Sequence, residues 1–198
     1  MKKIFALIAV LSALVAGETV ASAQMDITYS IGAGDTFRAY YFSDAKSVTA
    51  PGLSVDFEAN FRPSNRFAFS AGASLDGTIG YHFGGNKAIN LGEIFVRVPL
   101  RAKVYIPLGG RVEMYFFGGF VPELCLVSVD AHSKNVTDNF KENPNLRRFD
   151  LMAGAGVGLE IIDHIKVSLG YDHGIMDRDV SARKAHTGLV KLGVAYIF

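Results

Sequence analysis

The sequence predicts an all-β fold: an eight-stranded antiparallel up-and-down transmembrane β-barrel, preceded by a cleavable signal peptide. Hydrophobic residues make up 49% of the 198 residues, and the mean hydropathy is +0.24. Beyond the N-terminal segment, however, they alternate with polar residues and form no long apolar run. A period of two is the pattern of β-strands. Short and long connections between these segments alternate along the chain.

The first 23 residues have the three parts of a secretory signal peptide. Lys2 and Lys3 form a positive region, residues 4–16 form an apolar stretch of 13 residues, and Ala21-Ser22-Ala23 is a cleavage motif. A membrane-spanning helix needs about 20 apolar residues, so this stretch is too short. We expect cleavage after Ala23, which leaves residues 24–198 as one barrel domain.

Composition excludes several classes of protein. Removing residues 1–23 leaves 18 basic and 18 acidic residues, a balance that gives no reason to expect a nucleic-acid partner. Cys125 is the single cysteine, so an internal disulfide is excluded. No cofactor or metal is expected, because the glycines of residues 154–158 alternate as one strand face does and no His, Cys and carboxylate residues have metal-ligand spacing.

Eight segments carry the alternation. In residues 53–62, for example, apolar side chains occupy the odd positions and polar side chains the even ones. The expected strands are residues 26–34, 53–62, 66–76, 93–106, 111–120, 149–161, 165–172 and 189–198. Residues 37–42 blur the end of the first strand, which either continues past Gly34 or bulges there. Pro99 lacks the amide donor of a central strand and predicts a bulge.

The next question is which face of the sheet is buried. An ordinary soluble sheet also alternates, but here the polar face mixes charges of both signs with glycine and serine, which suits a crowded lumen. Residues 63–65, 107–110 and 163–164 are expected to be tight turns, and residues 35–51, 82–90, 126–147 and 174–186 longer loops. Short turns at one end and long loops at the other are typical of transmembrane barrels, whereas a lipocalin-type barrel keeps its apolar residues inside.

An eight-stranded barrel has an interior that side chains just fill, so no open pore is expected. Inward charges in such a lumen must neutralise one another, because a buried charge without a partner is costly. The expected lumenal charge network consists of Asp56, Glu58, Arg62, Glu93, Arg97, Arg101, Lys103, Glu113, Asp150, Glu160, Lys166, Asp172 and Lys191.

The last strand carries a family resemblance. Tyr196 and Phe198 lie on its apolar face two positions apart, which resembles the final strand of single-chain bacterial outer-membrane barrels. The resemblance implies a location in the bacterial outer membrane, lipid as a partner, and recognition of both aromatics by the barrel-assembly machinery during biogenesis.

A second resemblance covers most of the mature chain. "GEIFVRVPLRAKVYI" is similar to the "EIPLLLKY" strand of the PorT-like outer-membrane β-barrel domain family, and "RRFDLMAGAGVGLEI" with "IKVSLGYDHGI" to its paired late strands. The resemblance implies a barrel of this kind. The named member of that family serves a protein-secretion system.

Catalysis at the outer rim would need a nucleophile or an acid–base pair within hydrogen-bonding reach. The candidates on the loop side are His82, His132, His173 and His186, with Ser128, Ser133, Asp130, Asp172, Asp177 and Asp179, and none has a recognisable spacing. The sequence therefore favours a non-enzymatic protein with an envelope-structural or surface-interaction role through its long loops. The alternatives are a rim enzyme acting on lipid or protein, and an accessory component of a protein-secretion complex.

Overall fold

The computed structural model describes residues 26–42, 47–84, 87–132, 135–178 and 185–198, so the predicted signal peptide lies outside the described residues. The elements are β1 Asp26–Phe42, β2 Val48–Arg62, β3 Phe67–Gly84, β4 Lys87–Arg97, β5 Leu100–Gly109, β6 Val112–His132, β7 Asn135–Asp138, α2 Asn139–Glu142, β8 Phe149–Ile161, β9 Ile165–Gly174 and β10 Ala185–Ile197.

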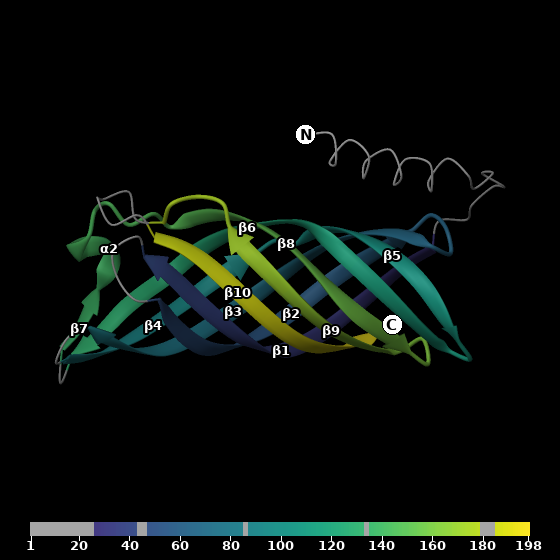
Figure 1. The fold of residues 1–198 in the computed structure, drawn as a ribbon, viewed down its shortest axis with the longest axis horizontal. Helices are drawn as coiled ribbons and strands as arrows, with labels where there is room; N and C mark the ends of the chain where they lie inside the picture. Colours follow the sequence, from purple (N-terminus) through teal and green to yellow (C-terminus); the bar gives the residue numbers. More distant parts are fainter. Residues whose placement is uncertain (1–25, 43–46, 85–86, 133–134, 179–184) are drawn as a thin grey trace.

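The strands close into a ring (Figure 1). Every pairing is antiparallel, β1 pairs with both β2 and β10, and a further β2–β3 pairing completes the circle. Strands β4 and β5 follow one another along a single wall position between β3 and β6, and β7 pairs only with β6. The wall therefore has eight strands, which confirms the predicted up-and-down barrel. Closure lets each backbone donor and acceptor of the wall find a partner within the chain.

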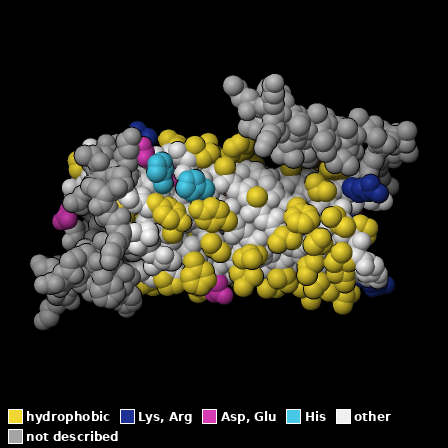
Figure 2. Space-filling model, viewed as in Figure 1, with side chains coloured by type: hydrophobic (Ala, Val, Ile, Leu, Met, Phe, Trp, Pro, Cys, Tyr) yellow, Lys and Arg dark blue, Asp and Glu magenta, His cyan; other side chains and the backbone are white. Residues whose placement is uncertain are grey.

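The polarity of the barrel is the reverse of that of a soluble protein. Leu53, Phe69 and Ile79 expose 68%, 61% and 69% of their surface, whereas Arg38 and Asp76 are fully buried. Figure 2 shows hydrophobic side chains spread over the wall, with few charged ones on that face. Water does not favour such a surface, but hydrocarbon does. Among the described residues, no helix has the length and apolar character to cross a bilayer.

The two ends of the barrel differ (Figure 1). At the turn end, β2–β3, β5–β6 and β8–β9 are joined by the short connections 63–66, 110–111 and 162–164. At the opposite, loop end, β6 continues as a hairpin with β7, followed by α2. The connections after β6 and β9 match the predicted long loops, whereas β4 begins at Lys87, only three positions after β3 ends at Gly84.

The strands extend further toward the loop end than predicted. β1 continues past Gly34 to Phe42, which is one of the two alternatives expected for residues 37–42, and it pairs with β10 in one register without a bulge. Residues 48–51, expected within a loop, extend β2. Most of the expected loop 82–90 is likewise strand. In β1 the reason is that polar side chains such as Thr36 and Arg38 point into the lumen, so their polarity does not indicate a loop.

The predicted bulge at Pro99 is wrong. Arg97 and Leu100 keep the same register against β3 and against β6, and the Pro99 carbonyl accepts a hydrogen bond from the Gly72 amide at 3.0 Å. The missing amide donor interrupts the ladder without adding a residue. The bulge lies instead in β6, where the register against β4 shifts at Ile94/Phe95 and leaves Leu126 and Val127 both facing outward.

The turn between β8 and β9 contains two non-glycine residues with positive φ, Ile162 at 54° and Asp163 at 61°. A hairpin turn with positive φ at both central residues prefers Asn and Gly at these positions, and a β-branched residue is strained there. We expect the double variant Ile162→Asn, Asp163→Gly to raise the free energy of unfolding by about 1 kcal/mol. Urea titration of the barrel in phospholipid vesicles measures this, and an unchanged or lowered value would contradict the proposed strain.

Candidate functional site: the lumenal ion-pair network

The lumen is crossed by charged side chains at three levels. At the turn-end level, Glu58 accepts hydrogen bonds from Lys103 at 2.7 Å and Lys166 at 2.6 Å, joining β2 to β5 and β9. Closer to the turns, Arg62 donates to Glu113 at 2.7 and 3.0 Å. These contacts join strands that are not neighbours in the wall.

The middle level centres on Arg97, which is 2% exposed. Its guanidinium lies 2.5 Å from Asp172, 3.3 Å from Asp76 and 3.2 Å from Glu123, so one side chain of β4 binds carboxylates of β9, β3 and β6. Arg101 shares Asp172 at 3.0 Å. On the other side of this level, Lys191 of β10 pairs with Asp56 of β2.

The loop-end level holds two guanidinium groups. Arg38 donates two hydrogen bonds of 2.7 Å to Glu123, and Arg178, from the connection after β9, donates one of 2.6 Å to Glu93. The Phe95 ring lies between them, 3.6 Å from the Arg38 guanidinium and 4.9 Å from that of Arg178. Burial acts to lower the pKa of Arg178, but Glu93 and its neighbours together raise that pKa above its ordinary value. The guanidinium is therefore charged at neutral pH.

The structure brings most of the predicted charges together. Ion pairs include Asp56, Glu58, Arg62, Glu93, Arg97, Arg101, Lys103, Glu113, Lys166, Asp172 and Lys191. The other two predicted charges, Glu160 and Asp150, accept hydrogen bonds from hydroxyl groups. Tyr105 donates to Glu160 at 2.8 Å, and Thr187 donates to Asp150 at 2.7 Å.

Four residues of the network were missed: Arg38, Asp76, Glu123 and Arg178. Arg38 and Arg178 fall in segments expected to be loops, and Glu123 follows Pro122 beyond the expected end of its strand. Asp76 was placed on the polar face of its strand but not in the network. Continuing the alternation past Gly34 would have placed Arg38 inside.

Glycine makes room for aromatic rings in this lumen. A Cβ atom at Gly158 would lie 2.2 Å from Cζ of Tyr115, and one at Gly156 would lie 2.3 Å from Cζ of Phe117. The glycines of β8 thus face two rings of β6, its neighbour in the wall. Tyr105, Tyr115 and Phe117 pack together there, with Ala68, as a buried apolar cluster within the polar lumen.

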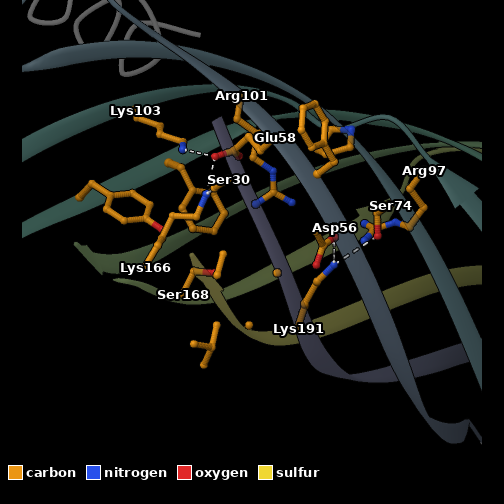
Figure 3. A pocket seen from close by; sticks show the side chains of 18 residues that line it. Ser30, Asp56, Glu58, Ser74, Arg97, Arg101, Lys103, Lys166, Ser168 and Lys191 are labelled. Atoms are coloured by element: carbon orange, nitrogen blue, oxygen red, sulfur yellow. Dashed lines mark hydrogen bonds and ion pairs between the residues drawn. The ribbon is translucent and has the colours of Figure 1, made fainter. Parts of the chain in front are cut away.

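A cavity of about 90 Å³ lies between the turn-end and middle levels. Figure 3 shows Lys103 and Lys166 meeting Glu58 on one side, and Lys191 meeting Asp56 on the other. The lining also includes small residues, among them Gly32 and Ser168, and the rings of Tyr115 and Phe117. A polar cavity of this size has room for several water molecules.

The candidate rim residues whose side chains the structure describes do not assemble into a nucleophile–base pair. His173 and His186 stack with ring centroids 6.2 Å apart, and His186 lies 3.1 Å from Asp177. Ser128, by contrast, points into the lumen and donates to Glu93 at 2.8 Å, and Asp172 is lumenal too. The side chains of His82, Asp130, His132, Ser133 and Asp179 lie outside the described residues. No group of three or more His, Cys, Asp or Glu residues within the described ranges is arranged to hold a metal ion.

The two aromatics of the last strand face outward at the turn end. Tyr196 and Phe198 expose 54% and 62% of their surface. Tyr196 stacks on His164, and Phe198 stacks on Tyr29 at 6.3 Å between ring centroids. The backbone of Phe198 also exchanges hydrogen bonds of 2.8 and 3.2 Å with that of Tyr29, so it continues the ladder that closes the barrel.

A closed antiparallel ladder, an apolar outer surface and an ion-paired interior define an integral membrane β-barrel. The chain belongs to the family of the outer membrane protein beta-barrel domain, whose sequence profile matches residues 4–198. It is therefore a protein of the bacterial outer membrane. This match does not distinguish the PorT-like subfamily from other outer-membrane β-barrels. Comparison with curated proteins finds no significant sequence match.

Solved structures of bacterial outer-membrane proteins share the fold. Ail, the attachment invasion locus protein of Yersinia pestis, aligns with a TM-score of 0.53 at 16% identity over 88% of this chain and 100% of that one. Neisserial surface protein A aligns with a TM-score of 0.51 at 14% identity over 85% and 96%. A major outer membrane protein from Thermus thermophilus aligns at 0.50, with 13% identity over 87% and 100%. At these identities the likeness concerns the fold alone.

Proposed function

We propose that this barrel is a non-enzymatic outer-membrane protein with an envelope-structural or surface-interaction role, carried by the rigid hairpin of its loop end. In outer-membrane barrels the long loops face the cell exterior and the short turns face the periplasm. The described residues of this protrusion are 126–132 and 135–148. The signal peptide, removed after Ala23, directs the chain to the envelope, and the mass of the mature protein tests that cleavage.

The observation that supports this proposal is the length and anchoring of β6. The strand has 21 residues, about twice what a tilted strand needs to cross the hydrocarbon. Its last residues, Val129–His132, pair with β7. Arg148 packs over the Phe140 ring at 3.9 Å, and Asn139 donates to Ser128 at 3.0 Å. Since Ser128 in turn binds Glu93, the protrusion is tied to the lumenal network.

A photo-crosslinking amino acid at Lys141, which is 85% exposed, tests the surface role. We expect crosslinks in intact cells to molecules at the cell surface. The same amino acid at Arg66, an exposed residue of the turn end, is the matched control and should give none of those products. Surface products from position 66 but not from position 141 would contradict the proposal.

A rim enzyme is the second candidate, and the Asp177–His186 pair beside His173 favours it. Such a dyad can activate water for hydrolysis of a lipid or protein. The test is hydrolysis by the barrel purified from membranes. Activity that His186→Ala abolishes would establish the enzyme, and identical background rates for both proteins would exclude it. An accessory role in a secretion complex, which the PorT-like resemblance suggests, is the third candidate.

We further propose that Tyr196 of β10 and the following Phe198 are recognised by the barrel-assembly machinery. Phe198→Ala should then lower the amount of folded barrel in cell membranes several-fold, while the purified variant still refolds in detergent. Phe120→Ala, which removes an equally outward phenylalanine elsewhere in the wall, is the control. Equal losses in both variants would point to lipid packing instead of recognition.

A further inference from the structure

One outward-facing residue breaks the pattern of the apolar wall. Among the outward side chains that the structure describes in the eight wall strands, Asp35 is the one with a formal charge. Its cross-strand neighbours are Leu53 of β2 and Leu192 of β10, which expose 68% and 48% of their surface. Within the described residues, no ion pair involves Asp35.

The depth of Asp35 follows from the aromatic residues on the same face of β1. Tyr29 lies six positions before it and stacks with Phe57 and Phe198. Tyr41 lies six positions after it and packs against His173. Aromatic belts mark the two interfaces of a transmembrane barrel. Six residues of a tilted strand rise roughly 15 Å, so Asp35 lies near the middle of the hydrocarbon.

A carboxylate at this depth is unfavourable in lipid alone. Ionisable residues inside a membrane are rare, and they pair with another polar group. Lipid headgroups are about 15 Å away, at the interfaces. The lumenal cations lie on the opposite side of the wall, because even-numbered residues of β1 point inward and Asp35 points outward. The partner must therefore come from outside the barrel.

We propose that the outer face around Asp35 binds a second membrane-embedded protein, which presents a lysine or arginine at mid-depth. Charge complementarity selects this occupant. A second copy of the chain, related by a two-fold axis through this face, would bring two carboxylates together. Phe37, two positions along β1 and 50% exposed, and Val190 of β10 supply apolar contact area beside the carboxylate. This surface is distinct from the protrusion of residues 126–132 and 135–148.

The first test places a photo-crosslinking amino acid at Phe37 in the full chain, expressed in cells that contain the native envelope. We expect a crosslinked protein that differs from the barrel itself, and at least a tenfold loss of the product when Asp35→Leu is added. The same amino acid at Phe116, an outward residue of β6, is the matched control. A product unaffected by Asp35→Leu, a product made of two copies of this chain, or lipid adducts alone would overturn the proposal.

The second test uses the isolated barrel and guards against misfolding of the variant. Asp35→Leu removes a charge from hydrocarbon, so in phospholipid vesicles without any partner it should increase the folding equilibrium constant about tenfold, and Asp35→Asn should increase it less. An Asp35→Leu barrel that is less stable than the wild type would mean that the carboxylate serves the barrel's own structure. Crosslinks at Lys141 should persist in the variant, which separates failure of this inference from failure of the proposed surface role.

Discussion

Replacing Arg97 with methionine is expected to lower the free energy of unfolding by about 3–5 kcal/mol, the cost of removing one partner from a buried ionic network. The side chain is 2% exposed and lies within 3.3 Å of three carboxylates. Methionine fills similar space but leaves Asp76 without its closest cation, since Lys191 is 3.9 Å away. Asp172 keeps its ion pair with Arg101, and Glu123 keeps its ion pair with Arg38. The variant therefore loses only part of the ionic network.

Urea unfolding of the barrel refolded in phospholipid vesicles measures this loss. Arg66→Met is the matched control, because Arg66 is an exposed residue of the turn end and its replacement should change the stability by less than about 0.5 kcal/mol. Similar small changes in both variants would show that the lumenal network contributes little to the stability of the barrel.

Replacing Leu100 with arginine is expected to cost about 2–4 kcal/mol in vesicles, as a cation on the lipid face near the bilayer midplane does. Leu100 is 47% exposed and begins β5, near the middle of the wall formed by β4 and β5. The same change at a half-exposed site on a protein in water would be nearly neutral. The predicted loss of stability therefore depends on Leu100 facing lipid and not water.

Leu100→Met, which keeps the position apolar, is the control and should stay within about 1 kcal/mol of the wild type. The midpoint of urea unfolding compares the three proteins. An arginine variant as stable as the methionine variant would show that the position faces water and would contradict the outward assignment of the apolar residues.

The strand pattern and the eight-stranded barrel were predictable because alternation depends only on local sequence and on the two faces of a strand. Leu53, Phe69 and Leu75 lie on the outer face, as their odd positions indicated. Strand ends were less predictable. The sequence left open whether the first strand continues past Gly34. Its polar residues Thr36 and Arg38 favoured a loop, but the lumen buries both side chains.

The partners within the lumen could not be read from the sequence. Alternation places Arg97 inside, but its contacts with Asp76, Asp172 and Glu123 depend on the register of several strands. The bulge at Leu126 shows why: one additional residue in β6 changes the register and carries no sequence signature that distinguishes it from its neighbours. The contribution of Arg178 depends on the path of a connection after β9, which no periodicity describes.

Nitroxide accessibility along β10 measures the polarity of the wall most directly. Single labels at positions 190, 192 and 194, and at 193 and 195, would be introduced in a Cys125→Ser background and reconstituted in vesicles. The account predicts frequent collisions with oxygen at 190, 192 and 194, and little contact with oxygen or with a water-soluble nickel reagent at 193 and 195. Collisions of the nickel reagent with positions 190, 192 and 194 would contradict it, because those side chains would then face water.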